Sequence, residues 1–299
     1  MRPLLEPFLG TEAIARGEFT KRTLYSRNQL IYRNVYLPRG VELTAERRAV
    51  AAWLWSGRRA TVAGLSAAAL HGSLWINGGE PAELTRTEGS ANDIVVHREV
   101  LRDDEVTTVE GIPVTTPART LYDLGRRKGL EKAVIRVDAL ANSCGVPVGT
   151  VRPLVESHRG ARGLAQLRTV LELMDGGAES PQETRTRLAL VRAGFRRPQT
   201  QIPVRDAAGY PFARIDMGWE EHRVGVEYDG EQHWTDPARF AHDIDRHAKL
   251  TALDWRIIRV SANLLRYRRA VIIERVFAAL DAAGCPWLAE CAVDPRQVA

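Results

Sequence analysis

The sequence predicts an α/β protein, α+β overall, in which helices and strands follow one another through three regions. Strand-like runs rich in Val and Ile are short and are separated by Gly, Pro or Asp. Between them lie stretches whose apolar residues recur at helical spacing. The 299 residues are 44% hydrophobic and 26% charged, an ordinary globular composition. This length is enough for two or three domains.

The first region, residues 1–43, is expected to be a winged-helix-like DNA-binding head. Its helical stretches carry Lys and Arg, and the strand-like LIYRNVYLPRG follows them. Pro38 and Gly40 close this stretch, which therefore predicts a basic hairpin.

The middle region, residues 44–175, is expected to combine helices and strands. ERRAVAAWLWSG and LSAAALHG are helical, and the second helix stops at Gly72. NDIVVHR, EVTTVE and IPVTT are strand-like. PARTLYDLGRR then begins a mostly helical stretch, with Pro117 near its start and a break near Gly145. No motif in this region outweighs a structural role.

The third region, residues 180–283, follows the linker MDGGAESP and precedes a tail, residues 284–299. Its patterns predict the order helix, three strands, helix, strand, helix. Such an order favours a mixed sheet packed between helices.

Three acidic residues of the third region are expected to meet on neighbouring strands. If the turn between ARIDMGW and VGVEYDG falls at EEHR, Asp216 lies opposite Glu227. Asp229 lies two residues after Glu227 and shares its face of the sheet. Crowded carboxylates repel one another, and a divalent cation relieves that repulsion. Mg²⁺ prefers such oxygen ligands and supports phosphodiester hydrolysis, with Mn²⁺ as a substitute.

Alternatives remain for these acids and for three further candidate catalytic residues. The acids could instead lie on a solvated face or pair with nearby arginines. Glu183 is either a fourth acid aimed at the metal or part of a helix capping box. His233 either orients water or contacts phosphate, or it is a turn histidine. Lys249 either meets phosphate or forms a salt bridge.

Two arginines of the third region are candidate DNA contacts. Arg246 follows Asp243 by three residues, so the pair could also be a helix-surface ion pair. Arg259 ends the strand WRIIRV and either meets phosphate or forms a salt bridge.

The string SPQETRTRLAL…RIDMGW…VGVEYDGEQHW…DIDRHAKL…WRIIRV resembles the very-short-patch-repair-like endonucleases of the PD-(D/E)xK, restriction-endonuclease-like fold. The resemblance covers about one hundred residues and implies a four-stranded mixed sheet flanked by helices and Mg²⁺-dependent DNA cleavage. It assigns Asp216 to the first acid, Glu227 to the second and Glu183 to the helical acid. Asp229 stands where the general pattern has lysine, so Gln232, His233 or Lys249 would have to replace it.

The amino-terminal stretch also resembles a known family. RGEFTKRTLYSRNQLIYRNVYLPRG, LSAAALHG and GIPVTTPARTLYDL are similar to AbiEi-like antitoxins and regulators of type IV toxin–antitoxin systems. The resemblance implies a winged helix-turn-helix head and a regulatory domain. DNA-contacting candidates in the head are Lys21, Arg22, Arg27 and Arg33, whose alternative role is a solvated basic face.

The net charge and the cysteine content predict a DNA-binding protein of a reducing compartment. The net charge of +5 makes nucleic acid a plausible partner. Three scattered cysteines fit a reducing compartment, and no apolar run approaches the roughly 18–20 residues that span a bilayer. We therefore expect a cytoplasmic protein that binds DNA, and a cognate toxin or a second copy as partner.

The main hypothesis is a Mg²⁺-dependent DNA endonuclease delivered by a DNA-binding head, in phage defence, repair or mobile-element biology. The alternative is an AbiEi-like repressor or antitoxin with a degenerate nuclease fold. A third hypothesis is a nuclease that acts on RNA or structured DNA, because the same residues would serve either substrate.

Overall fold

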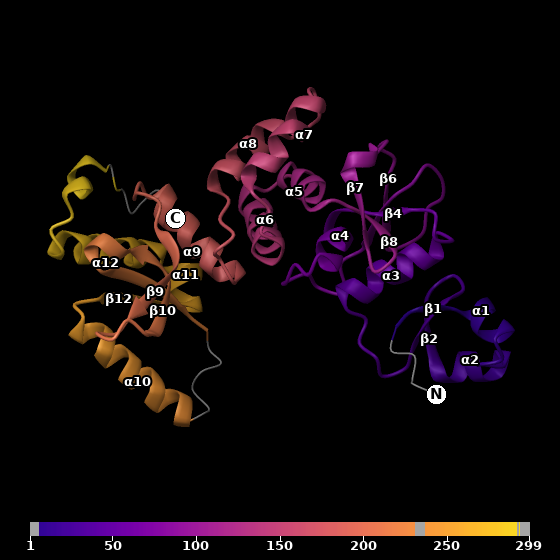
Figure 1. The fold of residues 1–299 in the computed structure, drawn as a ribbon, viewed down its shortest axis with the longest axis horizontal. Helices are drawn as coiled ribbons and strands as arrows, with labels where there is room; N and C mark the ends of the chain where they lie inside the picture. The colour runs from indigo at the N-terminus through magenta and orange to yellow at the C-terminus, as the bar shows by residue number, and fades with distance from the viewer. Residues whose placement is uncertain (1–5, 231–236, 292, 294–299) are drawn as a thin grey trace. The chain divides into compact units, whose positions relative to one another are not determined.

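The computed structural model describes residues 6–230, 237–291 and 293. The chain divides into two compact units, Met1–Met174 (the N-terminal unit) and Asp175–Ala299 (the C-terminal unit) (Figure 1). Each unit has its own sheets and hydrophobic core. The expected α+β class is confirmed. Within the described ranges, the helices are too short or too polar to cross a bilayer.

The N-terminal unit opens with short helices followed by a basic hairpin, as the sequence predicts. Thr20 caps the second helix by accepting the N–H of Thr23. Asn34 adopts a left-handed backbone, φ 63°, between the two hairpin strands. The sheet order is β1-β3-β2. The elements are β1 (Phe8–Leu9), α1 (Gly10–Ala15), α2 (Lys21–Arg27), β2 (Asn28–Tyr32) and β3 (Val35–Pro38).

A five-stranded sheet of order β6-β5-β4-β8-β7 follows. It is mixed, because β4 pairs with β8 and β5 with β6 in parallel, whereas the other pairs are antiparallel. Strands β4 and β5 have two and four residues, too few to show periodicity in the sequence. The elements are α3 (Ala45–Trp55), β4 (Thr61–Val62), α4 (Gly64–Leu70), β5 (Ala82–Thr85), β6 (Ile94–His97), the 3₁₀ helix η1 (Asp103–Glu105), β7 (Val106–Val109) and β8 (Ile112–Thr115).

Helices complete the N-terminal unit. Thr116 caps α5, and Pro117 is its first residue, as expected. The expected break after α6 is confirmed, since Gly145 has a left-handed backbone with φ 63°. The elements are α5 (Pro117–Gly125), α6 (Leu130–Cys144), the 3₁₀ helix η2 (Val148–Val151), α7 (Arg152–Ser157) and α8 (Leu164–Leu173).

The hairpin head and the five-stranded sheet share one hydrophobic core. Val35 of β3 and Ala49 of α3 are fully buried in the same cluster as Leu84 of β5 and Val114 of β8. Helix α3 therefore joins the head to the sheet, and the two pack as one body.

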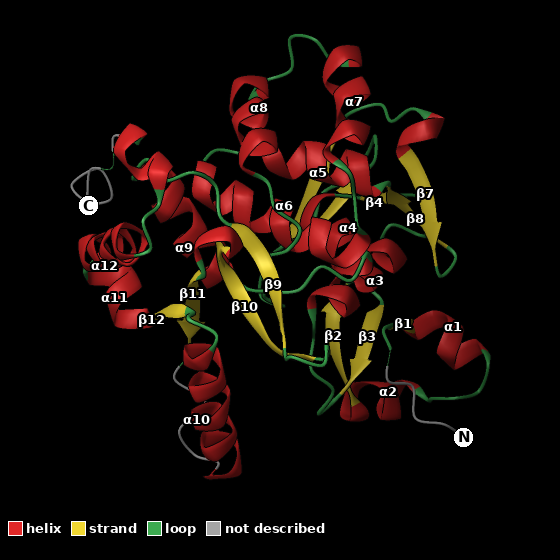
Figure 2. Ribbon diagram, turned by 60° about the vertical axis from the view of Figure 1, so that its left-hand side comes forward, coloured by secondary structure: helices red, strands yellow, loops and turns green. Residues whose placement is uncertain are grey.

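The C-terminal unit has the expected order of elements around a four-stranded sheet, β12-β11-β10-β9 (Figure 2). The sheet is mixed, because β11 and β12 are parallel while the other pairs are antiparallel. The elements are α9 (Pro181–Arg192), β9 (Gln199–Arg205), β10 (Pro211–Trp219), the 3₁₀ helix η3 (Glu220–His222), β11 (Val224–Asp229), α10 (Pro237–Ala252), β12 (Arg256–Ser261), α11 (Ala262–Tyr267), α12 (Arg269–Ala282) and the 3₁₀ helix η5 (Pro286–Glu290).

The register between β10 and β11 is the one predicted from the turn. Met217 lies opposite Val226, and Trp219 lies opposite Val224. These residues pack with α9 and α12 in the larger core cluster, which also contains the buried Trp287 of η5. The core of this unit thus extends beyond residue 283.

Candidate functional site

Asp216 and Glu227 lie at the end of the ladder between β10 and β11. The ladder ends at Met217 and Val226. One residue farther, the Asp216 side chain accepts the backbone N–H of Tyr228 at Oδ2, at 2.7 Å. The Asp216 carboxylate therefore lies against β11 next to Glu227, whose side chain is 9% exposed.

Glu183 approaches this point from the start of α9. The Ser180 hydroxyl accepts the Glu183 N–H at 3.1 Å, which is one half of the expected capping box. The Glu183 carboxylate accepts the N–H of Glu179 at 2.9 Å and the side-chain amide of Gln201 at 3.1 Å. The side chain therefore turns toward β9 and caps the residue before Ser180.

Glu183 and Glu227 disfavour a negative charge on Asp216. Burial, aided by the charges of Glu183 and Glu227, raises the pKa of Asp216 to about 7, against the opposing hydrogen bond from Tyr228 and the charge of Arg246. Burial is also the main cause that raises the pKa of Glu183. Glu183, Asp216 and Glu227 therefore form a local cluster that is short of positive charge.

Two arginines supply part of that charge. Arg246 of α10 donates to both oxygens of Glu227, at 2.7 and 2.9 Å, and to Asp243 at 3.0 Å. Arg259 of β12 donates to Asp243 at 2.6 Å and lies 3.6 Å from Asp229. The ion-pair alternatives for Arg246 and Arg259 are what the structure shows, and their DNA contacts stay predictions.

The acidic side chains around Asp216, among the described residues, are not arranged as a preformed site for a divalent cation. Within residues 6–230, 237–291 and 293, no group of three or more His, Cys, Asp or Glu side chains is arranged to hold a metal ion. Two of the predicted ligands are instead engaged by arginines. Arg246 donates to both oxygens of Glu227, and Asp229 lies 3.6 Å from Arg259. The donors nevertheless suit a hard cation in kind, since Gln201 Oε1 is buried without a hydrogen-bond partner beside Glu183.

The remaining catalytic candidates do not join this cluster in the described residues. Lys249 is exposed, and its Nζ lies over the Phe212 ring, 5.9 Å from the centroid. His233 and Gln232 lie outside the residues that the structure describes.

The four basic residues predicted to contact DNA are all solvent-exposed. No carboxylate in the described residues pairs with any of them. Three lie on α2 and one at the turn of the β2–β3 hairpin: Lys21, Arg22, Arg27 and Arg33.

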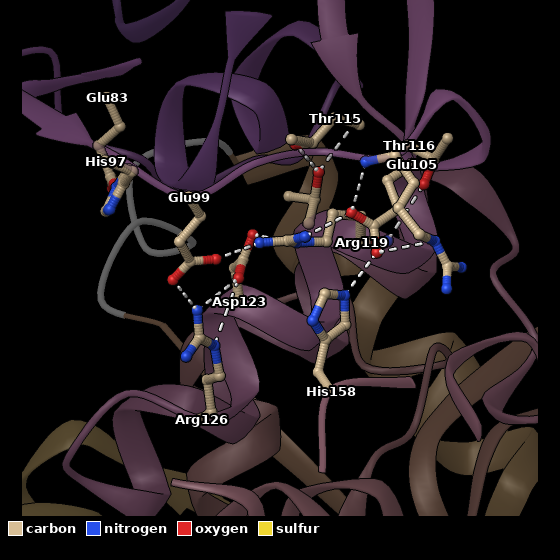
Figure 3. Close-up of polar contacts among 12 residues, drawn as sticks. Glu83, His97, Glu99, Glu105, Thr115, Thr116, Arg119, Asp123, Arg126 and His158 are labelled. Atoms are coloured by element: carbon tan, nitrogen blue, oxygen red, sulfur yellow. Dashed lines mark hydrogen bonds and ion pairs between the residues drawn. The ribbon is translucent and has the colours of Figure 1, made fainter. Parts of the chain in front are cut away.

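A second charged site, which the sequence patterns did not single out, lies in the N-terminal unit (Figure 3). Its centre is Arg119 of α5, whose side chain is 2% exposed. Arg119 donates to Glu105 at 2.6 Å, to Asp123 at 2.9 Å and to Glu99. Burying this guanidinium is tolerable because each side of its fork meets a carboxylate.

Glu105 anchors the buried end of this charged site. Its side chain is fully buried and accepts from His158 at 2.6 Å and from the backbone N–H of Arg102 at 3.2 Å. Burial raises the pKa of Glu105, but His158, the Arg102 amide and Arg119 outweigh it, so the pKa lies below its usual value.

Glu83 of β5 forms a neighbouring buried site. It accepts the N–H of Leu65 at the start of α4 at 2.9 Å, His97 at 2.8 Å and Arg127 at 2.8 Å. Burial raises the pKa of Glu83, yet these hydrogen bonds and the charge of Arg127 lower it to about 2. Gly64 permits this arrangement, because a Cβ there would lie 2.1 Å from Glu83 Oε2.

A cavity of about 230 Å³ opens beside both groups. Most of its lining is charged, with four arginines and two acids: Arg119, Arg126, Arg127, Arg162, Glu99 and Asp123. The motif PARTLYDLGRR held a signal for it, because Arg119, Asp123 and Arg126 recur at four- and three-residue spacing on one helix face. The other members come from separate elements, so no local pattern could add them.

The five-stranded sheet, the helices that follow it in the chain and the charged cavity lie within a region that matches a known domain family. Residues 60–173 match the AbiEi antitoxin C-terminal domain. Two relatives, both named as uncharacterized proteins, come from Mycobacterium tuberculosis strains CDC 1551 and H37Rv. Each is 29% identical over 190 residues, which are 64% of this chain and 69% of the relative. No solved structure matches the chain.

Proposed function

We propose that this protein is a DNA-binding regulator of the antitoxin type, in which an AbiEi-like domain is joined to a winged-helix-like head. The match of residues 60–173 to the AbiEi antitoxin C-terminal domain carries this proposal. It favours the regulator over the nuclease as the main activity, with a cognate toxin or a second copy of the chain as its protein partner.

The head supplies the DNA contacts in this proposal. Lys21, Arg22 and Arg27 lie on α2, and Arg33 lies at the hairpin turn, so a helix and a wing both present positive charge. These side chains are exposed and free of ion pairs within the described residues, so phosphate contact breaks no existing bond. Contacts of this kind position a protein on the duplex and release counterions.

Salt-dependent binding of the full chain to its own upstream DNA tests the proposal. We expect affinity to fall steeply between roughly 50 and 200 mM salt, and the combined change of Arg22, Arg27 and Arg33 to Ala to reduce the slope by about 3. Arg168→Ala, an exposed arginine of α8, is the matched control. Affinity that does not respond to salt, or that survives the triple change, would remove the head from DNA binding.

A second candidate function is metal-dependent phosphodiester hydrolysis by the C-terminal unit. The observation that favours it is the pKa of Asp216, about 7, beside Glu183 and Glu227. Bound Mg²⁺ would polarise phosphate and activate water. The predicted ligands Asp216, Glu227 and Asp229 would hold the ion, with Glu183 as a candidate fourth acid. Arg246 would have to release Glu227, since it now engages both carboxylate oxygens.

Calorimetric titration with Mg²⁺ and Mn²⁺, alongside cleavage of duplex, single-stranded and mismatched DNA and of RNA, tests this candidate. We expect Asp216→Ala and Glu227→Ala each to abolish ion binding and cleavage together. Asp281→Ala on α12 is the control, because it removes an exposed acid of the same unit. If no ion binds and no substrate is cut, metal-dependent hydrolysis by the C-terminal unit is refuted, and the regulator proposal stands without it.

A further inference from the structure

The cavity in the N-terminal unit is lined by more arginines than acids, although Glu105 and Glu83, outside the lining, pair with two of these arginines. Its lining contains Arg119, Arg126, Arg127 and Arg162 against two acids, Glu99 and Asp123. At about 230 Å³ it falls below the roughly 300–1,000 Å³ typical of pockets for drug-sized ligands. Its size and its arginine-rich lining therefore suit a small anionic group.

Glu99 occupies the position that such an anion would take. One oxygen of its carboxylate accepts from Arg126 at 2.6 Å, and the other accepts from Arg119 (Figure 3). A single carboxylate thus bridges the guanidinium groups of Arg119 in α5 and of Arg126, the C-cap of that helix. Bridging of this kind is how arginine pairs bind oxyanions.

Glu99 is more exposed to solvent than Glu105, the buried acid of the same network. It lies between β6 and η1, outside any helix or strand, and its side chain is 47% exposed. Glu105, by contrast, is fully buried in the network. Glu99 is therefore the member that can leave at least cost in solvation.

The arginines would stay paired if Glu99 left. Arg119 would keep Glu105 and Asp123, and Arg126 would keep Asp123 at 3.1 Å. Arg162 is exposed and pairs with no acid in the described part of the chain, so it offers further unused donors. The site can exchange one carboxylate for another anion without stranding a buried charge.

We propose that this cavity binds a phosphate or diphosphate group, which replaces the Glu99 carboxylate between Arg119 and Arg126. A phosphoryl group carries more charge than a carboxylate and presents three acceptor oxygens, enough to engage Arg119, Arg126 and Arg162 together. Glu99 then acts as a built-in competitor that keeps the arginines paired when the ligand is absent.

Calorimetry on the full chain tests this site, with inorganic phosphate, pyrophosphate and glycerol 2-phosphate as separate probes. Removing the competitor with Glu99→Gln is expected to tighten phosphate binding about tenfold. Arg162→Ala is expected to weaken it about fivefold while leaving the melting temperature unchanged, since Arg162 has no ion pair to lose. The probe that binds most tightly identifies the free anion, the diphosphate or the phosphate ester as the source.

Matched controls separate this site from general charge effects. Glu156→Gln on α7 removes one exposed negative charge from the same unit, and Arg168→Ala removes one exposed positive charge. Affinity that changes equally in Glu99→Gln and Glu156→Gln would overturn the proposal. So would the absence of binding of all three probes to both the unmodified chain and Glu99→Gln, with folding verified by circular dichroism.

Discussion

Arg246 of α10 holds Glu227 of β11 through two parallel hydrogen bonds, of 2.7 and 2.9 Å. The side chains are 19% and 9% exposed, so this pair lies mostly out of water. The hydrogen bond to Glu227 is the main cause that raises the pKa of Arg246 above its usual value. The same carboxylate that was predicted to bind a metal ion therefore serves as the counterion of a fixed guanidinium.

Arg246→Ala is expected to destabilise the C-terminal unit by about 3–5 kcal/mol, because it leaves the buried Glu227 without a partner. Chemical denaturation followed by tryptophan fluorescence measures the loss. The control Glu290→Ala breaks an exposed pair with Arg196 and should cost less than about 1 kcal/mol. If the two variants lose equal stability, the Arg246 pair is not a buried one in solution.

Asp216→Asn is expected to stabilise the protein at pH 8 but not at pH 4. The folded-state pKa of Asp216, about 7, is raised above its ordinary value of 3.8. The stability that protonated Asp216 contributes is therefore complete below about pH 4 and is lost as the pH rises through about 7. The loss is at most about 4 kcal/mol. Asn keeps an oxygen that can accept the Tyr228 N–H. Thermal unfolding in buffer with chelator measures the difference.

Asp281→Asn controls for the loss of one charge in the same unit, because Asp281 is exposed on α12. A stability difference between Asp216→Asn and the unmodified chain that stays constant from pH 4 to pH 8 would contradict the raised pKa.

Arg119→Ala is expected to be among the most damaging single changes in the N-terminal unit. It removes the shared partner of three carboxylates and leaves Glu105 fully buried, at a cost of about 3–5 kcal/mol. Arg119→Lys should rescue little, because one ammonium cannot reproduce the forked contacts. Denaturation midpoints measure both variants. Asp104→Ala, which opens the exposed pair with Arg102, should change the midpoint little; a loss as large as that of Arg119→Ala would refute the special role of Arg119.

Gly64→Ala is expected to destabilise the N-terminal unit by more than backbone strain alone. Gly64 has φ 53°, and an added Cβ would meet Glu83 Oε2 at 2.1 Å and Arg127 Nη2 at 2.5 Å. Gly111→Ala is the matched control, since φ there is 82° but nothing lies within 4 Å. We expect Gly64→Ala to lose at least about 1 kcal/mol more than Gly111→Ala, because overpacking adds to the strain. Equal midpoints in urea unfolding would show that the Glu83 contact yields without cost.

Local patterns in the sequence were enough to predict much of the fold. The turn at EEHR gave the correct pairing of Met217 with Val226, because a short hairpin turn fixes the register of both strands. Ser180 and Pro117 marked the starts of two helices through capping and a preset backbone angle. The short strands β4 and β5 went unpredicted, since their two and four residues are set by neighbours in the sheet.

In the candidate sites, too, local sequence predicted some features and tertiary packing set the others. The sequence by itself determined that Asp216 and Glu227 come together, because both lie close to one hairpin turn. Only the tertiary structure decided which partners these acids have, since Arg246 arrives from a helix nineteen residues later. It also gathered Glu99, Glu105, Arg119 and His158 from separate elements into one network. Periodicity and turn chemistry act over a few residues, whereas a buried charge takes whichever partner the packing of distant elements brings within hydrogen-bond reach.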